Sequence, residues 1–193
     1  MATNPSQSPR AKAVRMAQEI LAIQPVYVDT ETTGLGRDAE IVELAIVDHD
    51  GQVLMDQLFR PQQPIPEDAI RVHHITNEMV EDKPVWGIYW PTIRGIFFGK
   101  TISMYNADYD LRLIYQSNDR YGIKRERMNA FCVMKLYAQF RGEWDSRRGR
   151  YRWFRLEEAG AQAGIPIPNS HRAVDDTRLT RALLHWIAQQ PFS

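Results

Sequence analysis

The chain has 193 residues, of which 44% are apolar and 25% charged, and equal numbers of acidic and basic residues give a formal net charge of zero. This composition is typical of a soluble globular protein, and the length suffices for one domain with a substantial core. It excludes a uniformly basic surface. A polyanionic ligand would therefore have to be met by a local basic patch or by bound metal.

Cys132 is the only cysteine, which excludes an internal disulfide. The chain starts with a polar segment and no long apolar run follows, so neither a signal peptide nor a membrane span is predicted. We expect a cytoplasmic protein with a flexible tail over residues 1–9 and a single domain over residues 10–193.

Apolar spacing in the first half predicts a helix and then three strands, over residues 10–23, 26–31, 41–48 and 52–59. A turn over residues 49–51 joins the last two strands. Short helices should follow between residues 67 and 99, interrupted by Pro84 and Pro91.

The second half predicts a strand over residues 101–105, a helix over 108–120 and a strand over 130–133 that leads into another helix. Residues 139–155 look irregular, and two helices close the chain, over 156–163 and 172–189. Three successive strands followed by alternating helices and strands predict an α/β sandwich around one mixed sheet.

Asp29 and Glu31 lie two residues apart in the first predicted strand, so both side chains point to one face of the sheet. Their apolar neighbours suggest a central strand, where two adjacent carboxylates repel and lose hydration. A bound divalent cation would offset this repulsion and the loss of hydration. The alternative is that the pair lies at the end of the strand, in contact with solvent.

Two more pairs of aspartates lie further along the chain, Asp108 with Asp110 and Asp175 with Asp176. Helical geometry places the two members of each pair differently. At about 100° per residue, Asp110 and Asp176 fall on the apolar sides of their helices. Asp108 falls on nearly the opposite side, and Asp175 lies at the margin, where it can reach water. His171 stands in the loop or first turn before Asp176. Four inward carboxylates from separate segments are expected to converge, and an all-oxygen ligand set favours Mg²⁺ or Mn²⁺.

These residues resemble the motifs of the DEDDh-type 3′–5′ exonuclease family, which is related to the proofreading subunit of bacterial DNA polymerase III. Four segments carry the resemblance, in family order and within residues 26–184: Asp29–Leu35 (DTETTGL), Val72–Thr76 (VHHIT), Asn106–Asp110 (NADYD) and His171–Asp176 (HRAVDD). Three positions depart from the family pattern: Tyr105 replaces a histidine, His74 a glycine and Val133 a threonine.

The resemblance implies a ribonuclease H-like fold with a central mixed five-stranded sheet flanked by helices. It implies two Mg²⁺ or Mn²⁺ ions per active site and hydrolysis that releases nucleoside 5′-monophosphates. It assigns His171 as general base. The residues that it assigns as metal ligands are Asp29, Glu31, Asp110 and Asp176. The residues that it assigns as substrate contacts are Thr32, Leu35, Asp68, His73 and Asn106.

The expected partner is a nucleic acid with a 3′ end, most simply single-stranded DNA, with a polymerase or a second copy of the chain as further candidates. Residues 139–155 carry six arginines against two acidic residues, with five aromatic residues interleaved. This segment is either a contact for phosphates and unpaired bases or a solvated turn. RNA trimming, internal cutting and a non-catalytic polymerase-associated module remain alternative functions.

Overall fold

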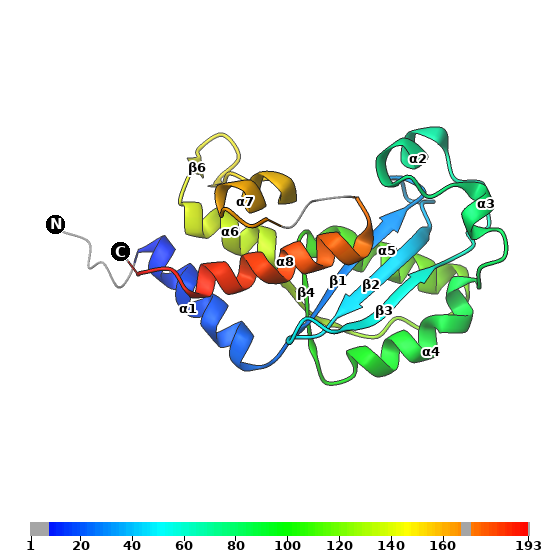
Figure 1. The fold of residues 1–193 in the computed structure, drawn as a ribbon, viewed down its shortest axis with the longest axis horizontal. Coiled ribbons are helices and arrows are strands. Elements are labelled where there is room, and N and C mark those ends of the chain that lie inside the picture. The colour runs from blue at the N-terminus through cyan, green and yellow to red at the C-terminus, as the bar shows by residue number, and fades with distance from the viewer. Residues whose placement is uncertain (1–7, 167–170, 193) are drawn as a thin grey trace.

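A computed structural model describes residues 8–166 and 171–192. Within these ranges the centre is a five-stranded sheet in the order β3-β2-β1-β4-β5 (Figure 1). β2 pairs antiparallel with β1 and β3, whereas β4 runs parallel to β1 and β5. The predicted mixed sheet is confirmed, with strands β1 Val26–Thr32, β2 Ile41–Val47, β3 Val53–Leu58, β4 Thr101–Met104 and β5 Asn129–Cys132.

Helices cover both faces of this sheet (Figure 1). One face packs on α1 Pro9–Ala22, α6 Val133–Arg141, α7 Leu156–Gln162 and α8 Ala173–Ala188. The other packs on α4 Trp86–Phe97 and α5 Ala107–Arg120. The side chains of β1 alternate between the two faces of the sheet. Tyr27 packs on the α8 side, and Val26 and Val28 pack on the α4 side.

Two short helices form a third, smaller core at one end of the sheet (Figure 1). They are α2 Glu67–His73 and α3 Asn77–Val80. Within the described part of the chain, no helix is long and apolar enough to cross a membrane.

Three local predictions were wrong. Pro91 lies inside α4 and does not interrupt it, because the buried side chains around it hold the helix against the sheet despite the missing hydrogen bond. Part of the segment predicted to be irregular forms a small antiparallel hairpin of β6 Trp144–Asp145 and β7 Arg150–Tyr151. Of the predicted tail, residues 1–7 lie outside the described ranges, and Ser8 caps α1, which begins at Pro9.

The sheet splits beside the second half of β1. Pairing between β1 and β4 involves only Val26 and Tyr27 on the β1 side, and β4 ends at Met104. Asn106 then occupies the N-cap position of α5, whose first turn follows directly. This end of β1 therefore has the start of α5 on one side and β2 on the other.

Candidate active site

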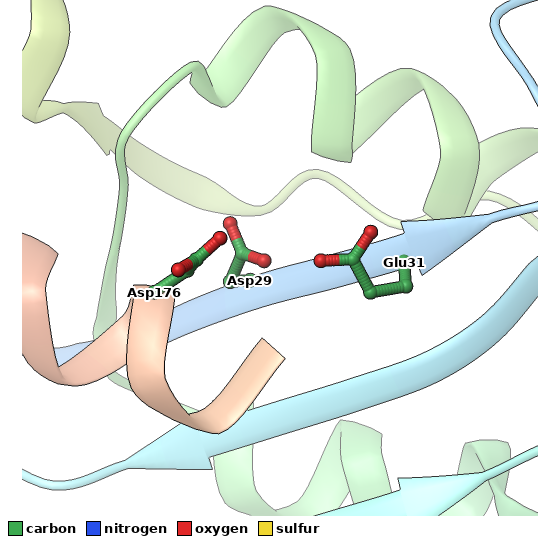
Figure 2. A group of neighbouring side chains, drawn as sticks. All are labelled: Asp29, Glu31 and Asp176. Atoms are coloured by element: carbon green, nitrogen blue, oxygen red, sulfur yellow. The ribbon is translucent and has the colours of Figure 1, made fainter. Parts of the chain in front are cut away.

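Three carboxylates from distant parts of the chain meet over β1. Asp29 and Glu31 project from the strand and Asp176 from the first turn of α8, and one oxygen of each lies within 4.8 Å of the others. Figure 2 shows the three side chains turned toward one another. The shared face predicted for Asp29 and Glu31 is confirmed, as is the burial of Asp176.

Asp110 adjoins this group from the split in the sheet. It is buried in the first turn of α5, and its carboxylate accepts a hydrogen bond of 2.8 Å from the hydroxyl of Thr30. Its charge is the strongest neighbouring charge acting on Asp29. Asp108 instead faces outward and pairs with Lys135, so the separation predicted from helical geometry is confirmed.

Burial and mutual repulsion make the ionised state of this cluster unfavourable. Burial is the main cause that raises the pKa of Asp29 well above its usual range, and Asp110 and Glu31 add to the shift. Burial, followed by the charge of Asp176, raises the pKa of Glu31 to about 9. Burial raises the pKa of Asp110 to about 7 against the effect of its hydrogen bond from Thr30.

These carboxylates fit a site for hard divalent cations. The donor set is made of oxygen atoms, which suits Mg²⁺ or Mn²⁺. Bound cations would supply the positive charge that the buried carboxylates lack. No cysteine or histidine joins the three-residue group formed within the described ranges, which speaks against a structural zinc site.

A fifth carboxylate, Glu43, was missed by the sequence analysis. It lies opposite Glu31 on β2, is fully buried, and accepts hydrogen bonds from the guanidinium of Arg172 and the backbone N–H of Ala173. This contact ties the start of α8 to the sheet. The signal was available, since Glu43 is the only charged residue in the strand sequence IVELAIV.

His171 precedes α8 by two residues and is exposed. Its φ of 53° lies in the left-handed region, which is uncommon for a residue with a side chain. The chain therefore turns sharply just before Arg172, whose side chain is held by Glu43. The predicted position of His171 ahead of the helix is confirmed, while its role as a base stays a prediction.

The residues expected to contact substrate lie around the cluster in different environments. Thr32 ends β1, and its hydroxyl contacts the carbonyl of Gly34 and the hydroxyl of Tyr109. Leu35, in the turn that follows, is 82% exposed. Asn106 is exposed at the start of α5.

His73 and Asp68 lie on α2. His73 is buried, its Nδ1 accepts a hydrogen bond from the backbone of Ile75, and burial lowers its pKa while the nearby backbone of Thr32 acts against that shift. This places His73 beside the end of β1. Asp68 is exposed and accepts a hydrogen bond from its neighbour Ala69, which does not direct it toward the cluster.

The three residues that depart from the family pattern lie in different environments. His74 ends α2 with a φ of 60°, the conformation that glycine adopts without strain. The hydroxyl of Tyr105 donates a hydrogen bond of 2.9 Å to the carbonyl of Phe154. Val133 is buried at the start of α6. None of the three substitutions removes a carboxylate from the cluster.

Residues 26–184 match the family described as Exonuclease. The chain belongs to this exonuclease family. It is 39% identical over 194 aligned residues, 97% of this chain and 96% of the relative, to an uncharacterized exonuclease of Escherichia phage 186. This exonuclease therefore matches a known relative along nearly its whole length.

Solved structures agree with the family assignment. Exonuclease X in complex with 5′-overhanging duplex DNA is 29% identical, with a TM-score of 0.61 over 84% of this chain and 89% of that one. The nuclease domain of 3′hExo, described as a DEDDh family member bound to rAMP, is 14% identical and shares the fold, with a TM-score of 0.68 over 83% and 89%. The predicted ribonuclease H-like fold is confirmed, and the protein is a 3′–5′ exonuclease of the DEDDh type.

Proposed function

We propose that this exonuclease removes nucleotides one at a time from the 3′ end of single-stranded DNA and releases nucleoside 5′-monophosphates. The convergence of Asp29, Glu31 and Asp176 within 4.8 Å, with Asp110 adjoining, carries this proposal. DNA is favoured over RNA because the 29% identical relative was solved with duplex DNA bearing a 5′ overhang.

The four carboxylates would hold two Mg²⁺ or Mn²⁺ ions against the scissile phosphate. Such ions stabilise the negative charge that develops on the attacking and leaving oxygens. Asp29 would be central to this ligand set, since the charges of Asp110, Glu31 and Asp176 all act on its carboxylate. Glu31 would complete the ligand set.

His171 would accept the proton of the attacking water. General-base catalysis by a histidine typically contributes roughly 10²–10⁴-fold in rate. Its exposed position lets the imidazolium return the proton to solvent after each cleavage. The Glu43–Arg172 contact holds the backbone from which His171 projects.

The terminal nucleotide would bind between the end of β1 and α2. Leu35 offers an exposed apolar side chain for its base, and Thr32 fixes the turn that carries Leu35 through its bond to Gly34. His73 is buried beside the end of β1, next to the backbone of Thr32, and would support this end of the binding site. Asp68 and Asn106 would contribute from the rim.

Degradation of labelled strands tests this function. With Mg²⁺ or Mn²⁺, 5′-labelled single-stranded DNA should shorten in one-nucleotide steps, 3′-labelled DNA should release its label at once as a mononucleotide, and a chelator or Asp29→Ala should stop both reactions. RNA and a 5′-overhanging duplex, run in parallel, define the substrate class.

Internal fragments from both labels would show an endonuclease instead. Tight DNA binding with no metal-dependent shortening of any strand would favour a non-catalytic module and reject the proposal.

A further inference from the structure

A pocket of about 370 Å³ lies at the start of α5. It is lined by Tyr105, Asn106, Met134, Trp153, Phe154, Arg155 and Leu156. Asn106 links the pocket to the acidic cluster, because its backbone carbonyl accepts from the N–H of Asp110 one helical turn later. The pocket and the cluster therefore both include a residue from the start of α5, Asn106 and Asp110 respectively.

The far wall of the pocket comes from residues 153–156, which follow the β6–β7 hairpin. Tyr105 holds this wall in place, since its buried hydroxyl donates to the carbonyl of Phe154. The Phe154 ring is itself buried against Tyr137. Trp153 and Arg155, on either side of Phe154, are thus held at a fixed place beside Asn106.

The exposed groups of this wall suit an unpaired nucleotide. Trp153 is 40% exposed, and the guanidinium carbon of Arg150 lies 3.2 Å from the centre of its ring. The side chain of Arg155 is 85% exposed and only loosely paired with Glu157, at 3.6 Å. Aromatic faces stack on bases, and exposed arginines attract phosphates.

We propose that this pocket binds the nucleotide on the 5′ side of the scissile phosphate, with its base against Trp153 and its phosphate near Arg155. The proposal rests on the proposed function, because it assigns the strand that enters the same active site. Charge complementarity favours a nucleic-acid strand as occupant, since Arg155 is the single charged residue among the described residues that line the pocket and its side chain is largely exposed. Asn106 both lines the pocket and is a proposed substrate contact, which favours the substrate strand as the occupant.

Binding in the absence of metal tests the pocket separately from catalysis. The affinities of a fluorescent hexathymidylate and of thymidine 5′-monophosphate are measured in chelator for the wild type and for Trp153→Ala. Loss of a stacking side chain should weaken hexamer binding roughly 5- to 150-fold. The mononucleotide is too short to occupy both the active site and the pocket, so its affinity should fall far less. Trp153→Phe should restore most of the hexamer affinity.

Trp144→Ala is the matched control. Trp144 is 60% exposed on the neighbouring β6–β7 hairpin, where it packs edge-on against Tyr151 at 5.3 Å and outside the pocket. Unchanged hexamer binding by Trp153→Ala, or an equal loss in Trp144→Ala, would overturn the subsite. Absence of any strand shortening by the wild type, with the hexamer result intact, would reject the proposed hydrolysis and leave the binding site standing.

Discussion

His171 lies on the exposed rim of the candidate active site, so its role as general base can be tested separately from metal binding. His171→Asn keeps a residue that tolerates the left-handed conformation at φ 53° but cannot accept a proton at neutral pH. We expect kcat to fall roughly 10²–10⁴-fold. The thermal stabilisation by Mg²⁺ should persist, since the carboxylate ligands are untouched.

Steady-state rates and melting temperatures of the same preparations check this. His49→Ala, in the β2–β3 turn, is the control and should keep wild-type kcat, because its side chain pairs with Asp50 in the same turn and its backbone carbonyl, which the change keeps, accepts the hydrogen bond from Arg181. A His171→Asn enzyme with wild-type kcat would exclude the general base. A variant that no longer responds to Mg²⁺ would identify His171 as a metal ligand instead.

Periodicity made the acidic residues predictable from sequence. Strand alternation placed Asp29 and Glu31 on one face, and the helical repeat separated Asp110 from Asp108. Glu43 escaped because its role depends on a partner 129 residues away, and no local pattern contains that contact. A lone charged residue in an apolar strand could have flagged it.

At the scale of elements, one buried ion pair fastens α8 to β2. Arg172→Gln would leave the Glu43 carboxylate buried with only the N–H of Ala173, and removal of one partner of a buried pair typically costs about 3–5 kcal/mol. Because Arg172 is 39% exposed, we expect the lower end of that range. The start of α8 should loosen, and kcat should fall at least about 10-fold, since Asp176 lies in its first turn.

A double-mutant cycle in urea isolates the contact. Glu43→Gln with Arg172→Gln should cost less than the two single changes added together, because neither charge is then left without its partner. Arg178→Gln, on an exposed part of α8 and 3.6 Å from Asp175, should change stability by less than about 1 kcal/mol. Additive costs would show that the pair does not couple the two elements.

Elements were predictable where they are long and periodic, and less so elsewhere. The β6–β7 hairpin has two residues in each strand, too few for alternation to appear in sequence. α4 carries Pro91 in its interior, where local rules favour an interruption, yet Trp86, Trp90 and Ile93 are buried around it. In both places tertiary packing decides the local structure.

At the scale of the whole molecule, the acidic cluster couples folding to pH and to divalent cations. The pKa of Glu31 is raised from 4.5 to about 9 and that of Asp110 from 3.8 to about 7 in the folded chain. The folded state therefore binds more protons than the unfolded state between these values, so its stability falls as pH rises. In chelator, the melting temperature should decrease from pH 5 to pH 9.

Cations should reverse this trend, because they bind only where the carboxylates are gathered and ionised. At 100 times its Kd a ligand stabilises by about 2.7 kcal/mol, which for a chain of this size corresponds to a rise in Tm of roughly 5–10 °C. The rise should be larger at pH 9 than at pH 6. Calorimetry with Mg²⁺, Mn²⁺ and chelator across this range measures it.

Asp29→Asn separates the cluster from the other titrating groups. Loss of one buried charge lowers the repulsion on Glu31, so this variant should melt higher than the wild type in chelator at pH 9 and gain little from Mg²⁺. The opposite order in chelator, with Asp29→Asn melting well below the wild type, would mean that the carboxylates stabilise the fold without a cation. The cluster would then be a structural network, and the cation site would have to lie elsewhere.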